Sequence, residues 1–153
     1  MNDTIQLSDQ LTVATTQLNP EQLQALAGAG YRSVLNLRSP SEPGFSTEEQ
    51  QQVEAAGLQY LNIPVDPAQI TDPLTDKILT QMEQLAKPIL LHCSSGIRSG
   101  AMALIYVAIQ QGMSVDQAMA KNRLWGLGLA TKPQIQQFVQ DYIARHSRVN
   151  LVT

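Results

Sequence analysis

The sequence predicts an α/β fold, and three observations support that class. Short apolar runs alternate along the chain with longer segments whose apolar residues recur at helical spacing. Glycine, proline and asparagine stand between these segments, where turns are expected. One run, residues 88–92, is almost continuously apolar, as is typical of a strand covered on both faces of a parallel sheet. The length of 153 residues fits one domain, so we expect a single domain over residues 1–153.

The first predicted elements are a short strand and a helix. Residues 11–15 form an apolar run with β-branched side chains, which favours a strand. Asn19 can cap the following helix, and Pro20 fits its first position, where a backbone N–H would have no partner. Because glycine readily ends a helix, this one should end at Gly28 or Gly30.

A second strand and a second helix follow. Residues 31–38 alternate between apolar and polar side chains, and this period of two predicts a strand. Residues 39–45 contain two prolines and a glycine and should therefore form a loop. Ser46 and Glu49 have the spacing of a capping box, which opens a helix that Gly57 ends.

The third strand is expected over residues 58–65. Asp72 followed by Pro73 then gives a capping residue and a proline at the first helical position, so a helix should run to about residue 86. The apolar strand 88–92 comes next.

Helices complete the chain. One should span residues 98–111 and end at Gly112. Ser114 and Gln117 again have the spacing of a capping box and open the next helix. The last helix should begin near residues 131–133 and run to about residue 146.

Composition and charge restrict the classes of function. A net charge of −3 and a pI of about 5.2 argue against a protein that holds nucleic acid by neutralising phosphates, while one local basic pocket for a small anion is compatible with them. The longest apolar stretches, residues 88–91 and 101–109, are shorter than the ~20 residues of a membrane span. We therefore expect neither a nucleic-acid nor a membrane partner. The oligomeric state leaves no sign in the sequence.

Cysteine and histidine are scarce. The single cysteine, Cys93, cannot form an internal disulfide, which fits a reducing compartment. With two histidines and one cysteine there are too few ligands for a zinc site, and we expect no metal and no other cofactor. The first residues lack the basic flank and apolar run of a secretory signal, so we expect a cytoplasmic location.

Residues 91–100 carry the chemistry of the chain. They join the apolar strand to a helix, and the unpaired N–H groups and the dipole at such a helix start bind anions. Gly96 and the small residues beside it let the backbone curve around the anion. Cys93 begins this loop, where a helix N-terminus and a nearby arginine favour the nucleophilic thiolate. Arg98 can bind two oxygens of a phosphate through its planar guanidinium.

Three nearby residues are assigned lesser roles. Ser99 can hydrogen-bond the Cys93 sulfur and stabilise it as a leaving group. Because neighbouring side chains of a strand point to opposite faces, we expect His92 to order the loop backbone rather than to act as a base. Arg38 ends the second strand at the sheet edge where ligands bind, so it can face the same pocket, but we favour the interpretation as a solvated loop arginine.

The segment His-Cys-Ser-Ser-Gly-Ile-Arg-Ser at residues 92–99 resembles the active loop of cysteine-dependent protein phosphatases, which have five residues between Cys and Arg where this chain has four. Residues 11–38 and 60–65 resemble the phosphatase-like domain of beta-lactamase hydrolase-like proteins. That family is similar to dual-specificity phosphatases and tends to carry the shorter loop. The resemblance covers about residues 11–112. It implies a cysteine-phosphatase-like fold with a central, mostly parallel sheet of four to five strands flanked by helices.

The resemblance also implies roles for individual residues. Cys93 matches the nucleophile, Arg98 the phosphate-binding arginine and Ser99 the hydroxyl residue that follows it. The backbone amides that hold the substrate phosphate belong to Ser94, Ser95, Gly96 and Ile97.

Phosphatases of this kind also use an aspartate as a general acid, on a loop upstream of the cysteine and often after an Ile-Pro pair. Asp66 follows the segment Ile-Pro-Val at residues 63–65 and is the first choice for this acid. Asp72 is the second choice, since it can equally be a helix cap.

Three functions remain open at this point. The first is hydrolysis of a phosphorylated small molecule or a phosphoprotein through a phosphocysteine, with tyrosine or dual specificity. The second is rhodanese-like sulfur transfer with a persulfide on Cys93, because a Cys–four–Arg loop is also the rhodanese pattern. The third is a non-catalytic anion-binding module. The helical segments that follow the loop helix are typical of phosphatases and favour the first function.

Overall fold

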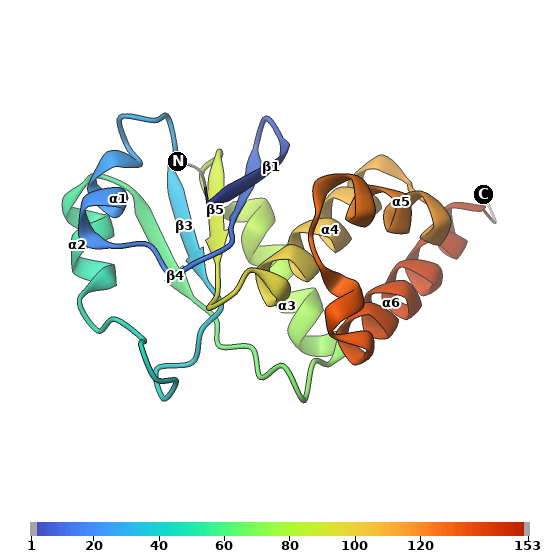
Figure 1. Cartoon of the computed structure of the whole chain (residues 1–153). Helices are drawn as coiled ribbons and strands as arrows, with labels where there is room; N and C mark the ends of the chain where they lie inside the picture. The colour runs from blue at the N-terminus through green and yellow to red at the C-terminus, as the bar shows by residue number, and fades with distance from the viewer. Residues whose placement is uncertain (1–2, 152–153) are drawn as a thin grey trace.

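A five-stranded sheet organises the molecule (Figure 1). A computed structural model gives the structure of the chain and describes residues 3–151. The strands are β1 Thr4–Ser8, β2 Leu11–Ala14, β3 Ser33–Asn36, β4 Gln59–Asn62 and β5 Ile89–His92. Their order is β1-β2-β5-β3-β4, and every neighbouring pair is parallel except β1 with β2. The predicted α/β class and mostly parallel sheet are confirmed.

Helices cover both faces of the sheet. They are α1 Pro20–Ala25, α2 Glu49–Ala55, α3 Asp72–Gln84, α4 Ile97–Gln111, α5 Val115–Trp125 and α6 Pro133–Leu151, with the 3-10 turn η1 Leu129–Thr131 before α6. Helices α1 and α2 lie on one side of the sheet, and α3 to α6 lie on the other (Figure 1).

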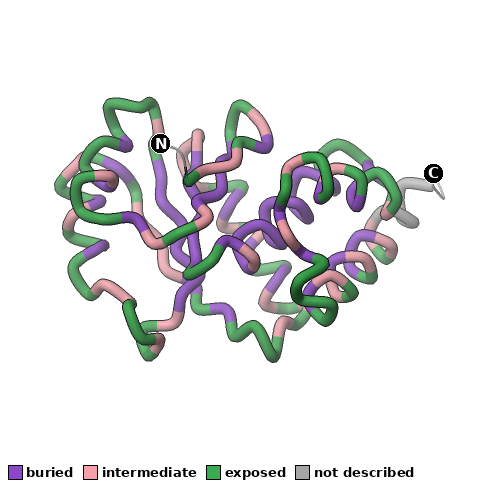
Figure 2. Tube along the Cα trace, viewed as in Figure 1, coloured by how far each residue is buried: buried purple, intermediate pink, exposed green. Residues whose placement is uncertain are grey.

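Strand β5 forms the centre of the core. All its residues are buried, because β5 pairs with β2 on one side and with β3 on the other. Leu90 packs in the cluster beneath α1 and α2, whereas Ile89 and Leu91 join the larger cluster on the opposite face. Figure 2 shows this buried path continuing from the sheet into α4. The prediction of a strand covered on both faces is therefore confirmed.

Two predicted helix caps are confirmed in atomic detail. Asn19 Oδ1 accepts a hydrogen bond from the Gln22 N–H at 2.8 Å, and the Gln22 side chain returns one to the Asn19 N–H. The same reciprocal pair joins Ser114 and Gln117 at the start of α5. These caps use only neighbouring residues, which is why the sequence predicts them.

The predicted capping box at Ser46 is wrong. Helix α2 begins at Glu49, and the residue before it, Glu48, makes no capping hydrogen bond through its side chain. The Glu49 side chain is fully buried and bonds to two residues far away in the sequence, so it cannot reach back to Ser46. A tertiary contact has replaced the local one.

The cap of α3 also differs from the prediction. Thr71, not Asp72, caps this helix, since Thr71 Oγ1 accepts from the Leu74 N–H at 3.3 Å. Asp72 is the first helical residue, and both its carboxylate oxygens accept from Arg145 of α6.

Two further differences concern the first part of the chain. Helix α1 ends at Ala25, earlier than the predicted Gly28 or Gly30, and turns occupy residues 26–30. Strand β1 is absent from the prediction, although Ile5 and Leu7 have the alternation of a strand.

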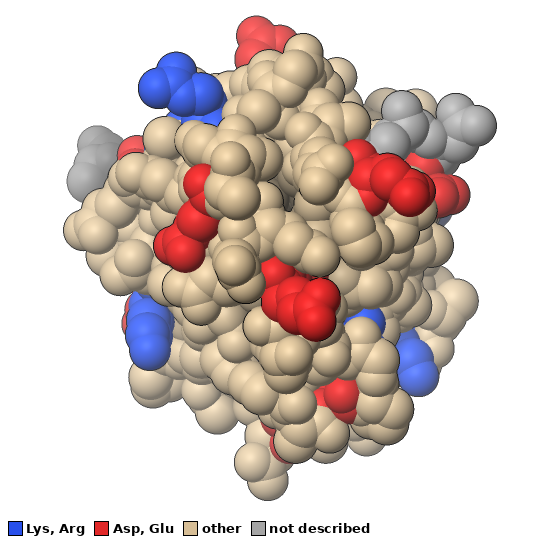
Figure 3. Space-filling model, turned by 90° about the vertical axis from the view of Figure 1, so that its left-hand side faces the viewer, with Lys and Arg blue, Asp and Glu red and all other residues tan. Residues whose placement is uncertain are grey.

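The surface beside α1 and α2 carries scattered charges. Figure 3 shows this side of the molecule, where acidic side chains lie singly between neutral ones and the Lys and Arg side chains stand near the margins. Within the described residues visible there, the basic side chains form no continuous patch. This face therefore offers no broad surface for a polyanion.

Candidate active site

The loop from β5 to α4 is shaped by one glycine. Gly96 is the N-cap of α4 and has a φ of 90°, a conformation that residues with a side chain rarely adopt. A Cβ atom at this position would also stand 3.0 Å from the Cα of Thr15, the residue that follows β2. The tight turn thus directs the Gly96 N–H back toward Cys93, the residue that begins the loop.

The sulfur of Cys93 has two polar contacts. The Gly96 N–H donates to Cys93 Sγ at 3.2 Å, and the Ser99 hydroxyl oxygen lies 3.4 Å from the same sulfur. Both Cys93 and Ser99 are fully buried. The structure thus brings Cys93, Gly96 and Ser99 together as the sequence predicts.

Arg98, in the first turn of α4, links three loops. Its Nη1 donates to the Glu42 carboxylate at 2.6 Å and to the Val65 carbonyl at 2.8 Å. Its Nη2 donates to the other Glu42 oxygen at 3.0 Å and to the Ser94 hydroxyl at 3.1 Å. The arginine is 6 % exposed, so its position is fixed by these partners rather than by solvent.

The pair between Arg98 and Glu42 changes the pKa of both groups. The hydrogen bonds from Arg98 lower the pKa of Glu42 from 4.5 to about 2. The pKa of Arg98 is raised, first by the same hydrogen bonds and further by the neighbouring charge of Cys93. Both members of the pair are therefore charged at neutral pH.

A chain of buried and half-buried polar side chains continues behind this pair. Arg38 Nε faces Glu42 Oε1 at 3.4 Å, and Arg38 Nη1 donates to Gln17 Oε1 at 2.8 Å. Gln17 Nε2 in turn donates to Glu49 Oε1 at 2.8 Å. The interpretation of Arg38 as a solvated loop arginine is wrong, because the side chain is buried and held between Gln17 and the loop that carries Glu42. We call the connected side chains of Gln17, Arg38, Glu42, Glu49 and His92 the polar network.

His92 closes the polar network at the strand. Its Nε2 is hydrogen-bonded to Glu49 Oε2 at 2.5 Å, and both residues are fully buried. Its Nδ1 lies 3.5 Å from the Cys93 carbonyl oxygen. The ring therefore points toward α2, on the opposite face of the sheet from the Cys93 sulfur, in the arrangement expected from strand alternation.

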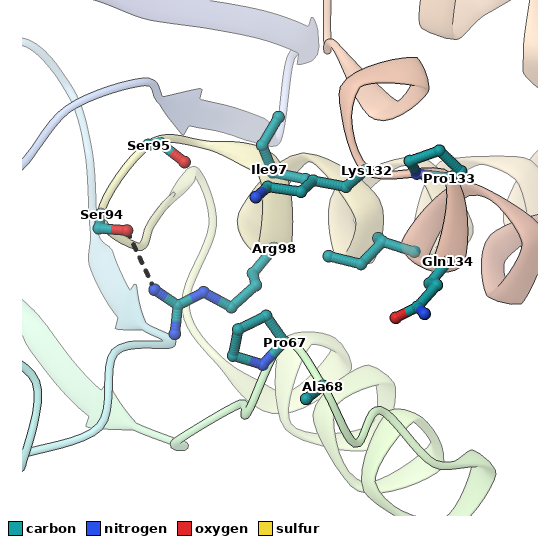
Figure 4. Close-up of a pocket in the computed structure, with 10 residues that line it drawn as sticks. Pro67, Ala68, Ser94, Ser95, Ile97, Arg98, Lys132, Pro133 and Gln134 are labelled. Carbon is teal, nitrogen blue, oxygen red and sulfur yellow. Dashed lines mark hydrogen bonds between the residues drawn. The ribbon is translucent and has the colours of Figure 1, made fainter.

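A pocket opens in front of the loop (Figure 4). Its volume is about 680 Å³, within the range of small-molecule sites. Ser94, Ser95, Ile97 and Arg98 form its floor. Pro67 and Ala68 come from the segment between β4 and α3, and residues 132–135 come from the start of α6. Of the predicted site residues, Ser94, Ser95, Ile97 and Arg98 thus line the pocket. Cys93, Gly96 and Ser99 are buried and do not line it, and the Gly96 amide is turned to the Cys93 sulfur.

The two candidate acids are in different surroundings. Asp66 is exposed and directly precedes the pocket residue Pro67, and its Oδ1 accepts from the Ala68 N–H at 2.9 Å. Asp72 lies on α3 and is held by Arg145, with Nη2 to Oδ1 at 2.7 Å. Asp66 is therefore adjacent to the pocket, whereas Asp72 is occupied elsewhere.

The sequence reasoning missed Glu42, Glu49 and Lys132. Glu42 was included only as part of a loop, and its signal is a position at the carboxyl end of β3, where ligand-binding loops gather in parallel sheets. Glu49 stands four residues before the buried Val53, and this spacing puts it on the inward face of α2. Lys132 gave no local signal.

Across residues 3–151, no helix is both long and apolar enough to cross a membrane. The same part of the chain contains no group of three His, Cys, Asp or Glu residues arranged to hold a metal ion.

Comparison with known proteins identifies a family. Residues 3–113 match the model of the phosphatase-like domain of beta-lactamase hydrolase-like proteins. A beta-lactamase hydrolase-like protein from Xylella fastidiosa (strain Temecula1) is 28% identical over 129 residues, which are 82% of this chain and 30% of that protein. The chain thus spans less than a third of the length of this relative.

Solved structures share the whole fold. A crystal structure from Shewanella putrefaciens CN-32, described as a phosphatase candidate with a DUF442 assignment, has a TM-score of 0.78 and 28% identity, and covers 94% of this chain and 90% of its own. The TpbA protein of P. aeruginosa, solved in complex with pTyr, has a TM-score of 0.78 at 16% identity, covering 99% and 91%.

Proposed function

The chain belongs to the family of phosphatase-like domains of beta-lactamase hydrolase-like proteins, and from this premise we propose that it hydrolyses phosphate monoesters with Cys93 as the nucleophile. The single observation that carries the proposal is the environment of the Cys93 sulfur. A backbone N–H and a hydroxyl contact it, and the buried Arg98 is hydrogen-bonded to Ser94 of the same loop. Such preorganised donors support the binding of an anion beside the sulfur.

Arg98 retains donors for the substrate while bound to Glu42. A carboxylate that accepts from both Nη1 and Nη2 occupies the end of the guanidinium fork. The side edge, formed by Nε and the Nη2 hydrogen now on Ser94, then serves two phosphoryl oxygens. In this proposal Glu42 fixes the plane of the guanidinium, and Ser94 yields its hydrogen bond when the phosphate binds.

The reaction proceeds in two steps. The Cys93 thiolate attacks phosphorus, so that an S–P bond forms and the ester P–O bond breaks, and Asp66 protonates the departing oxygen. Water then attacks phosphorus, Asp66 takes its proton, and the S–P bond breaks to release phosphate and the thiolate. The Ser99 hydroxyl beside the sulfur stabilises this thiolate as it leaves.

The pocket indicates the size of the substrate. A volume of about 680 Å³ accommodates a phosphorylated small molecule or a single phosphorylated side chain of a protein. The lone thiol of Cys93 must stay reduced to react, so we propose a cytoplasmic location.

The first experiment measures release of phosphate from an aryl phosphate by purified protein. We expect turnover that disappears in Cys93→Ser, together with a phosphocysteine intermediate that is trapped by acid quench in the native protein. A native protein without activity on a panel of aryl phosphates would refute the proposal.

A second experiment tests the acid. Asp66→Asn should lower kcat for phenyl phosphate by ~10²-fold or more, because the poor leaving group needs a proton. The loss should be much smaller for 2,4-dinitrophenyl phosphate, whose leaving group needs none. Asp116→Asn, an exposed aspartate of α5, is the matched control. Equal rates in Asp66→Asn and the control would remove Asp66 from the mechanism.

Sulfur transfer is the second candidate, because the loop has four residues between Cys93 and Arg98. Its assay is formation of thiocyanate from thiosulfate and cyanide. Activity in this assay with none on aryl phosphates would reverse the order of the two functions.

A further inference from the structure

The charged residues that line the pocket are all cationic, although the chain has a net charge of −3. Of the described residues that form its walls, Arg98 and Lys132 are cationic and none is an aspartate or glutamate. Arg98 is already paired with Glu42 through two hydrogen bonds. The uncompensated positive charge of the pocket is therefore that of Lys132.

Lys132 is placed by its backbone. Its N–H donates to the Leu129 carbonyl at 3.0 Å and closes η1, and the next residue, Pro133, begins α6. The side chain extends from this turn toward Ser95 and Ile97, whereas the Arg98 guanidinium turns toward Ser94 (Figure 4). No acidic group of residues 3–146 lies within ion-pair distance of its ammonium group.

We propose that Lys132 binds a second phosphate group of the substrate, so that the preferred substrates are small molecules carrying two phosphates on one short skeleton. This inference rests on the proposed function, since the first phosphate is the one that Cys93 attacks. The two cations stand on different walls of one pocket, Arg98 on the loop side and Lys132 on the α6 side. A single phosphate at the loop thus leaves Lys132 available for another anionic group.

The origin of Lys132 in the chain supports a role in selection. The family model matches residues 3–113, which include the loop with Cys93 and Arg98. Lys132 lies beyond that match, in the segment that supplies the opposite wall. The wall that contacts the body of the substrate is thus separate in sequence from the part that performs the reaction.

The test compares phenyl phosphate with the benzene-1,2-, 1,3- and 1,4-diyl bisphosphates, as kcat/KM per phosphate group. In the native protein at least one bisphosphate should be preferred by about tenfold, the lower end for a hydrogen bond to a charged group. Lys132→Gln should remove that preference and leave phenyl phosphate within about twofold, while Lys132→Arg keeps it. Lys77→Gln removes an equal charge from an exposed site on α3 and should change neither rate.

Three other outcomes would overturn the inference. A native protein that does not prefer any bisphosphate, or a Lys132→Gln variant that keeps the preference, overturns the inference. A Lys132→Gln variant that loses rate equally on both substrates also overturns it, because the lysine then serves the reacting phosphate.

Binding to the Cys93→Ser protein separates this inference from the proposed function. Calorimetry would compare pyrophosphate with inorganic phosphate in Cys93→Ser and in Cys93→Ser with Lys132→Gln. Tighter binding of pyrophosphate that depends on Lys132 supports the second-phosphate site even if no ester is hydrolysed. Equal binding by both proteins counts against the site even if hydrolysis is established.

Discussion

The two faces of the sheet hold the candidate site in different ways. On the α3–α6 face, Cys93 belongs to a large apolar cluster, and its sulfur has polar contacts with the Gly96 N–H of its own loop and with the Ser99 hydroxyl in the first turn of α4. On the α1–α2 face the apolar cluster is small, and the polar network runs from His92 to Glu42 beside it. Arg98 connects the two systems, since it follows the Cys93 loop and bonds to Glu42.

The difference shows that one face of the sheet mainly stabilises the fold, while the other mainly orients the side chains of the candidate site. Apolar contacts have no direction, so the α3–α6 face supplies free energy and holds the start of α4 in place. Hydrogen bonds have a direction, so the polar network fixes the angle of a guanidinium and of a strand end. Substitutions on the two faces should therefore affect different measurements.

The largest effect is expected from the apolar face. Leu104→Ala removes a fully buried side chain of α4 and should lower the free energy of unfolding by roughly 2–5 kcal/mol. Because Leu104 belongs to the large apolar cluster, which contains no member of the polar network, kcat on an aryl phosphate should stay within about twofold at a temperature where the variant is folded. Urea unfolding and steady-state kinetics measure the two quantities. A large loss of kcat in the folded variant would show that the faces are not separable.

Glu49→Gln should give the opposite result. The amide keeps the shape of the side chain but loses the charge beside His92, so the ring and the Cys93 carbonyl next to it are held less firmly. We expect kcat to fall about tenfold or more, since small displacements of a nucleophile are costly, with KM nearly unchanged. The free energy of unfolding should fall by only ~1 kcal/mol. The comparison fails if stability falls as far as in Leu104→Ala while kcat is kept.

The smallest effect concerns Glu42 and pH. The pKa of Glu42 in the folded protein is about 2, below its ordinary value of 4.5. The carboxylate therefore stabilises the fold fully above pH 4.5, and this contribution is lost as the pH falls toward 2. Glu42→Gln should lose less stability than the native protein over that interval. The difference should be about 1 kcal/mol, because Glu42 is partly exposed. Urea midpoints at pH 5, 4 and 3 would measure it, and parallel curves for the two proteins would contradict the assignment.

The parts of the structure that the sequence predicts are those fixed by near neighbours. The caps at Asn19 and Ser114 depend on residues three positions away, and the strand 88–92 is recognisable from its own apolar run. The Cys93 loop is likewise continuous in sequence, which is why Cys93, Gly96 and Arg98 are all predicted together.

The missed parts depend on contacts between distant residues. Glu42 and Arg98 are 56 positions apart, and His92 and Glu49 are 43 apart, so no local spacing connects them. Strand β1 carries only Ile5 and Leu7 as apolar signals, and its partner β2 becomes evident only in the folded sheet. The failed capping box at Ser46 has the same cause. Its spacing is correct, but the Glu49 side chain is hydrogen-bonded to the buried His92 and does not cap the helix.

The hydrogen bond from Arg98 to the Val65 carbonyl has a mechanical consequence. Val65 immediately precedes Asp66, so the Arg98 guanidinium beside the Cys93 loop also holds the backbone from which the proposed proton donor projects. In the proposed mechanism, an anion that shifts Arg98 on binding would shift that backbone as well. Substrate binding and the placement of the proposed acid would then be coupled through one shared side chain.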